Sequence, residues 1–301
     1  MTTLTMSNRA GEFIVDEVNP IFTREKVVVA SGQDLGAGAV LGRVTKAQAA
    51  AAIPTIVGTG TGAMTALTFG PDVQIGNYVI TLLATSATAA FSVVAPDGTV
   101  LPNGAVGTAY TSTHLSFLIS SAGTMTIGDA YTVAVSAGGT PALVGTGTGL
   151  VSGISLGPDA QLGAYRVQLL ATSATAEFEV IAPDGSKLKR GQVATAYTSN
   201  HVNFTLANGG TMTSGDYFVL IVAKGSGKVK ALAPTATDGT QDAYGVLHAD
   251  IDASSGDATG VAIVRGPAVV ESAALVFANT VTTAQKARAL SQLVAAGIVA
   301  R

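Results

Sequence analysis

The chain contains no cysteine and no tryptophan, and charged residues make up only 12% of its 301 positions. Without cysteine there can be no disulfide, no thiolate metal ligand and no cysteine nucleophile. The formal net charge of −3 provides no positive field for a nucleic-acid backbone, so we expect no nucleic-acid partner. No apolar run approaches the roughly 18 residues of a membrane span, and the first residues lack the apolar segment of a signal peptide. We therefore expect no membrane partner and no recognisable export signal.

What the chain does contain favours β structure. Apolar residues make up 48% of the sequence but aromatic residues only 5%, so the cores must consist mainly of Val, Ile, Leu and Ala. The 36 glycines, together with many Thr, Ser and Val residues, favour short strands joined by tight turns. The length is enough for two or three domains, since a globular domain usually has roughly 100–150 residues.

An internal duplication organises the chain. The segment Gly-Thr-Gly-Thr-Gly at residues 58–62 recurs 87 residues later, at residues 145–149. About half of the positions between 58 and 137 are identical to their counterparts. The same offset relates five further pairs of segments: 70–72 and 157–159, 82–89 and 169–176, 95–98 and 182–185, 108–112 and 195–199, and 123–126 and 210–213. Repetition of this kind indicates two copies of one fold.

Each copy has the pattern of a small β-sandwich. Apolar residues alternate with polar ones in short runs such as residues 165–170 and 178–181, which is typical of half-buried strands. Pro-Asp-Gly at residues 96–98 and 183–185 favours tight turns. Six or seven strands per copy predict two tandem immunoglobulin-like sandwiches, at residues 54–140 and 141–226.

The two flanks, residues 1–53 and 227–301, hold too few strands to close separate cores. We expect them to fold together into one small β-rich domain, with the repeats inserted at a surface hairpin. Residues 47–54 and 224–227 are the expected linkers. Near the C-terminus, Thr282 or Thr283 can cap a helix over residues 284–296, and Gly297 is its natural end. The predicted fold class is therefore mainly β, with a split domain that carries a C-terminal helix and is interrupted by two sandwich repeats.

Excising the repeats brings a series of motifs into order. Residues 32–45 are then followed by 227–229 and 238–247. Further segments follow at residues 250–252, 261–266, 271–275, 283–290 and 297–299. This composite resembles the lambda-type bacteriophage head decoration (capsid-stabilising) protein family. The resemblance covers both flanks, about 125 residues, and none of the repeat region.

The resemblance implies a structural virion protein and not an enzyme. It implies a homotrimer on the outer surface of a mature phage capsid, bound to the major capsid protein at local three-fold positions, with no cofactor and no metal. An N-terminal arm, residues 1 to about 19, is expected to fasten it to the shell by adding a strand to an exposed sheet edge. The candidate capsid-binding residues of this arm are Thr2, Thr3, Leu4, Thr5, Met6, Phe13 and Ile14.

Several residues of the repeats suggest sharper alternatives. His114 and His201 occupy equivalent positions, so they could form a duplicated ligand site, although one histidine per copy favours a structural role. The acid pairs Asp72 with Asp97 and Asp159 with Asp184 could bind Ca²⁺, but Gly-Pro-Asp and Pro-Asp-Gly are ordinary turn sequences. The Gly-Thr-Gly-Thr-Gly segments resemble a phosphate loop, yet no lysine follows them.

A second function remains open at this point. No Gly-x-Ser-x-Gly nucleophile elbow occurs in a strand-turn-helix setting, so hydrolase chemistry is not expected. The tyrosine pairs Tyr110 with Tyr197 and Tyr78 with Tyr165 could line a surface that binds glycans weakly, although core positions are the commoner use of such residues. The alternative to capsid stabilisation is therefore a surface-displayed adhesion module that binds host glycans, or a component of a tail or fibre.

Overall fold

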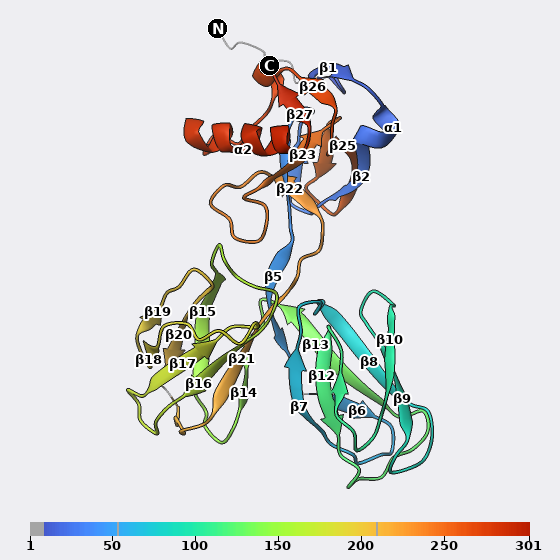
Figure 1. Ribbon diagram of the computed structural model, residues 1–301, viewed down its shortest axis with the longest axis vertical. Helices are drawn as coiled ribbons and strands as arrows, with labels where there is room; N and C mark the ends of the chain where they lie inside the picture. The colour runs from blue at the N-terminus through green and yellow to red at the C-terminus, as the bar shows by residue number, and fades with distance from the viewer. Residues whose placement is uncertain (1–8, 53, 209) are drawn as a thin grey trace. The chain divides into compact units, whose positions relative to one another are not determined.

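The computed structural model describes residues 9–52, 54–208 and 210–301 (Figure 1). The protein is mainly β, with one long helix near the C-terminus, which confirms the predicted fold class. The chain divides into two compact units: Met1–Thr45 with Gly225–Arg301, called unit 1, and Lys46–Lys224, called unit 2.

Unit 1 is built around a closed barrel to which both ends of the chain contribute strands. The barrel order is β2 (Arg24–Val29), β22 (Val229–Ala231), β4 (Val40–Arg43), β23 (Ala243–Leu247) and β25 (Ala258–Ile263). A second sheet pairs β3 (Gln33–Leu35) with β24 (Ile251–Ala253). A third has the order β1 (Ile14–Glu17), β26 (Ala268–Val270) and β27 (Ile298–Ala300). Short helical turns are α1 (Pro20–Thr23) and η1 (Ser272–Ala274).

The interior of unit 1 joins residues from both flanks. Inside the barrel, Val29 and Leu41 from the first flank pack with Val229 and Leu247 from the second. A second apolar cluster places Phe13 with residues of β26, β27 and the long helix. Because apolar burial is the main favourable term in folding, the two flanks stabilise each other across the inserted segment.

The long helix α2 (Thr283–Ala295) has the ends that its sequence predicts. Thr282 is the N-cap: its hydroxyl accepts the Gln285 N–H, while the Gln285 side chain accepts the Thr282 N–H. This reciprocal pair is a capping box. After Ala296, Gly297 has φ +81°, a left-handed conformation that glycine adopts without a steric penalty.

In unit 2 the two copies have matching strands. The strands of the first copy are β6 (Thr55–Val57), β7 (Met64–Phe69), β8 (Gly76–Leu82), β9 (Ala90–Val94), β10 (Val100–Ala105), β11 (Tyr110–Thr111), β12 (Leu115–Ile119) and β13 (Ala130–Ala137). Those of the second are β14 (Ala142–Val144), β15 (Leu150–Leu156), β16 (Gly163–Leu169), β17 (Glu177–Ile181), β18 (Gly191–Gln192), β19 (Ala196–Tyr197), β20 (Val202–Ala207) and β21 (Tyr217–Lys224). In the first copy, strands β10-β9-β8-β13 are hydrogen-bonded in one sheet and β11-β12-β7 in another. In the second copy, the corresponding strands are β18-β17-β16-β21 and β15-β20-β19.

The segment that was expected to be the first linker is instead the strand that joins the copies. β5 (Lys46–Ala51) pairs antiparallel with β13 on one side and with β21 on the other. The result is one 11-stranded sheet that runs through both copies. An alanine-rich run gives little strand signal in the sequence. Ala49 and Ala50 are nevertheless buried here, and Ala49 packs in the core cluster of the first copy.

Candidate functional site

The small sheet β1-β26-β27 lies at one end of unit 1 and contains both the first and the last described strand, with β26 between them (Figure 1). β1 runs antiparallel to β26, and β26 runs parallel to β27. The Arg301 N–H donates to the Val270 carbonyl (2.9 Å). The predicted arm, residues 1 to about 19, includes β1, so the described part of the arm lies at this end of unit 1.

Residues 9–13 fix the chain to unit 1 just before β1. The Glu12 carboxylate accepts the Arg9 N–H (2.8 Å), which closes a turn. The Gly11 N–H donates to the His248 carbonyl (2.9 Å), and the Glu271 N–H donates to the Phe13 carbonyl (2.8 Å). Gly11 has φ +72°, so a side chain here would be strained. The described chain is thus held firmly from about residue 11 onward.

This geometry changes what can be expected of the seven predicted capsid-binding residues. Thr2, Thr3, Leu4, Thr5 and Met6 lie outside the described residues. Ile14 is half-buried and pairs with Val270 in the small sheet. Phe13 is fully buried in the core of unit 1, so its inclusion among residues that fill a partner's pocket is corrected: in this conformation it anchors the arm. The sequence places an aromatic residue near the N-terminus but does not say which surface buries it.

A cluster of charged residues holds β1 against β2. Arg24 Nη2 lies 2.6 Å from Glu17 Oε2, and Thr23 donates its hydroxyl to the same carboxylate. Arg24 Nη1 lies 3.0 Å from Nε2 of His248. Burial raises the pKa of Glu17, but the hydrogen bonds from Arg24 and Thr23 outweigh it and hold that pKa below its ordinary value. Burial, aided by the Arg24 charge, lowers the pKa of His248.

Exposed apolar side chains occur at the end of the predicted arm and directly after it. They belong to β1, to α1 and to the turn between them: Val15, Val18, Ile21 and Phe22. Ile21 is 94% exposed, although isoleucine is among the residue types most often buried. Several such side chains within eight residues are typical of an interaction surface. We call these four residues the apolar shoulder. Val15 and Val18 fall within the predicted arm, but the sequence pattern does not show that they form a folded surface with Ile21 and Phe22.

The insertion joins unit 1 at Thr45 and Gly225. The chain departs at Thr45, after β4, and returns at Gly225, before β22, and the Gly225 N–H donates to the Thr45 carbonyl (2.9 Å). β22 runs parallel to β2, with Val229 opposite Val29. Within unit 1, this junction lies at the end away from β1 and α1 (Figure 1).

The duplicated histidines of the repeats support buried tyrosines. The Tyr78 hydroxyl accepts the Gln74 N–H (2.8 Å) and lies 3.1 Å from Nδ1 of His114. In the second copy, Tyr165, Gln161 and His201 make the same contacts. Burial raises the pKa of Tyr78 to about 12, so its hydroxyl keeps its proton at neutral pH. These contacts give both histidines a structural role.

One acid of each predicted Ca²⁺-binding pair, Asp97 and Asp184, accepts hydrogen bonds from neighbouring groups. Hydrogen bonds from Thr99, first of all from its backbone N–H, and from the Gln74 amide lower the pKa of Asp97 to about 2. Hydrogen bonds from Ser186, first of all from its side chain, and from the Gln161 amide lower the pKa of Asp184 to about 2 as well. Within the described parts of the chain, no group of three or more His, Asp or Glu side chains has the geometry of a metal site.

The backbone N–H groups of each Gly-Thr-Gly-Thr-Gly loop donate hydrogen bonds to an aspartate side chain of the same copy. The Asp129 carboxylate, which is buried, accepts the N–H groups of Thr59 (3.1 Å) and Gly60 (2.7 Å). Asp216 makes the equivalent bonds with Thr146 and Gly147. A side chain at Gly58 would overlap the Asp129 carboxylate, which explains the glycine. The loop therefore connects the start of each copy to its last strand.

The tyrosines that suggested a glycan-binding surface are in the cores of the repeats. Their exposed fractions are at most 5%. They are Tyr78, Tyr110, Tyr165 and Tyr197. Tyr110 and Tyr197 pack against phenylalanine rings of the same copy, with ring centroids 4.8 and 4.9 Å apart. These four side chains therefore cannot bind a glycan in this structure, which removes the reason for that prediction.

A comparison with known protein families matches residues 3–298 to the bacteriophage lambda head decoration protein D family. The chain belongs to this family. It is a head decoration protein, a structural component of the phage virion at the capsid surface. No curated protein and no solved structure matches the chain. No helix within the described ranges is long and apolar enough to cross a membrane.

Proposed function

We propose that this head decoration protein forms a homotrimer at the local three-fold positions of a mature capsid and binds the major capsid protein through its N-terminal arm. The observation that carries the proposal is family membership over residues 3–298. The geometry of unit 1 supports it, because the arm begins at an end of the unit that also presents the exposed apolar shoulder.

The arm acts by strand addition in this proposal. An extended segment that pairs with a sheet edge of the shell gains backbone hydrogen bonds, and its alternate side chains enter pockets. Leu4 and Met6 are two residues apart and would share one face of such a strand. Phe13 anchors the arm to unit 1, so a pull on the arm is transmitted to the barrel core. The apolar shoulder is then buried against the shell or a neighbouring subunit.

The insertion faces away from the shell in this proposal. Its junction with unit 1, at Thr45 and Gly225, lies at the end of unit 1 away from β1 (Figure 1). Unit 2 can therefore be carried on the virion without occupying the binding surface. The alternative, an adhesion module with exposed tyrosines, has lost its structural basis because those tyrosines are buried.

Heating of purified shells tests the stabilising role. Shells that lack the protein should rupture several degrees below shells saturated with it, because a ligand that binds only the intact state stabilises that state. The measurement is the release of packaged DNA, followed by dye fluorescence against temperature. Serum albumin at the same concentration is the control, and coincident rupture curves with and without the protein would refute the proposal.

Removal of the insertion tests which unit binds. We replace residues 46–224 by Asn-Gly, which suits a two-residue hairpin between the paired Thr45 and Gly225. The shortened protein should fold and should raise the rupture temperature as much as the full chain does. Circular dichroism checks folding, and co-sedimentation with shells checks binding. A folded variant that no longer sediments with shells would show that unit 2 supplies shell contacts.

A further inference from the structure

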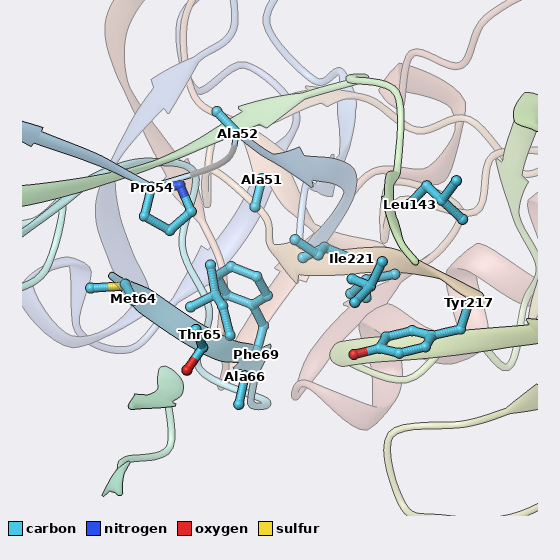
Figure 2. A pocket seen from close by; sticks show the side chains of 13 residues that line it. Ala51, Ala52, Pro54, Met64, Thr65, Ala66, Phe69, Leu143, Tyr217 and Ile221 are labelled. Carbon is cyan, nitrogen blue, oxygen red and sulfur yellow. The ribbon is translucent and has the colours of Figure 1, made fainter. Parts of the chain in front are cut away.

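A cavity of about 300 Å³ lies between the two copies within unit 2 (Figure 2). β5, β7, β14 and β21 supply most of its walls. Its lining is mainly apolar: Ala51, Ala52, Pro54, Met64, Thr65, Ala66, Leu67, Phe69, Leu143, Val144, Tyr217, Val219 and Ile221. The cavity is partly open to solvent, and ligand-binding sites of proteins are typically concave, mainly apolar pockets of this kind.

The duplication provides an internal comparison for this cavity. The side chains on the outward face of β21 are larger and more apolar than those on the same face of β13, its counterpart in the first copy. The residues are Tyr217, Val219 and Ile221 on β21 and Ala130, Thr132 and Ala134 on β13. Val219 and Ile221 pack into the core cluster of the first copy, whereas Tyr217 is only partly buried. The residues of β21 that line the cavity therefore have no equivalents on β13, so the duplication does not create a second cavity of the same kind.

A strained residue forms part of the cavity wall. Ala66 has φ +53°, a left-handed conformation that costs a residue with a side chain about 1 kcal/mol. Its counterpart in the second copy is Gly153, which has φ +62° and no such penalty. The first copy thus has an alanine where the second has a glycine that adopts this conformation without strain, and the methyl group of Ala66 adds apolar surface to the cavity.

One polar group points into the apolar cavity. Figure 2 shows the Tyr217 ring lying along one side with its hydroxyl directed inward, and this hydroxyl has no hydrogen-bond partner within the described residues. The Arg166 guanidinium carbon lies 4.0 Å from the centroid of the ring, a cation–π contact that fixes the ring and adds positive charge nearby. Arg166 has no ion-pair partner among residues 9–52, 54–208 and 210–301.

We propose that this cavity binds a small anionic amphiphile. An aromatic ring system or a short alkyl chain fills the apolar space, and its anionic head group accepts a hydrogen bond from the Tyr217 hydroxyl in the field of Arg166. A volume of about 300 Å³ is at the small end of ligand-binding cavities, so one or two fused rings fit and a polymer does not. This activity is independent of the attachment of unit 1 to a shell.

Methionine NMR tests the proposal at single-residue resolution. The full chain is labelled with ¹³C in its methionine methyl groups and titrated with naphthalene-2-sulfonate. Met64 lines the cavity, whereas Met125 and Met212 are equivalent residues in the cores of the two copies. The Met64 resonance should shift and saturate while the other two stay in place. Equal or non-saturating shifts of all three, or no Met64 shift, would overturn the proposal.

Two variants separate the apolar and polar parts of the site. Val144→Phe narrows the cavity and should abolish the Met64 shift, whereas Val57→Phe, at the equivalent and 66% exposed position of the first copy, should leave it unchanged. Tyr217→Phe removes the hydroxyl and should weaken binding about tenfold. The Met125 and Met212 resonances report that each variant is folded. Full binding by Val144→Phe, or full affinity in Tyr217→Phe, would contradict the assigned site.

Discussion

Deletion of residues 2–8 is expected to weaken attachment to the shell at least about 100-fold while unit 1 stays folded. An added strand contributes several backbone hydrogen bonds, each worth about 1 kcal/mol, and every 1.4 kcal/mol is a factor of ten in affinity. The fold should survive because Gly11 and Phe13, which fix the chain to unit 1, remain in place. Co-sedimentation with shells measures attachment, and thermal unfolding measures the fold.

Paired substitutions within the arm make this test specific. In an extended strand, Leu4 and Met6 lie on one face and Thr3 and Thr5 on the other. Leu4→Ser with Met6→Ser should lose most of the binding, whereas Thr3→Ser with Thr5→Ser should keep it, because only the first pair removes apolar side chains. If the truncated protein sedimented with shells as well as the full chain, the arm would have no part in attachment and the apolar shoulder would be the better candidate.

The elements with a local signal were predictable from the sequence. Helix α2 is one of them: Thr282, Gln285 and Gly297 specify its ends through hydrogen bonds and a left-handed turn that involve only neighbouring residues. The strands of the two copies are another, because the alternation of apolar residues is repeated and each run ends at a turn sequence. Duplication also made the structural role of His114 and His201 the simpler interpretation, and the contacts with Tyr78 and Tyr165 support it.

Features that depend on distant partners were not predictable. β5 is a strand because it pairs with the edges of β13 and β21. The run of alanines at residues 49–52 contains no pattern that predicts this pairing. Phe13 was assigned to the partner's pocket because the residues that bury it, in β26, β27 and α2, lie more than 250 positions away. The apolar shoulder was missed for the opposite reason, since exposure of Ile21 is visible only after folding.

The two tyrosine pairs of the repeats are a further case in which the sequence does not determine whether a side chain is buried or exposed. A tyrosine can serve a core or a surface, and the choice depends on which strand faces which sheet. Tyr78 and Tyr165 alternate with exposed residues on β8 and β16, and their side chains face the sandwich interior. The tyrosine that does reach a cavity, Tyr217, has no tyrosine counterpart in the first copy. New binding chemistry would therefore be found where the two copies differ and not where they agree.

Phe13→Ala is expected to destabilise unit 1 by about 3–5 kcal/mol, because truncation of a buried phenylalanine loses its burial and leaves a cavity. The loss should be confined to unit 1, since its apolar clusters share no residue with those of unit 2. Hydrogen exchange of backbone amides, measured separately for β23 and β16, reports the two units independently.

Phe91→Ala is the matched control for this prediction. Phe91 is a fully buried phenylalanine in the first copy, so its truncation should increase exchange in unit 2 and leave β23 unchanged. The reciprocal pattern would show that the domain at the shell and the inserted pair are separate cooperative units. Equal losses in both units from either variant would contradict this, because they would mean that the whole chain unfolds as one. Independent units are what a decoration protein needs if an insertion is to be carried without weakening the part that holds the shell.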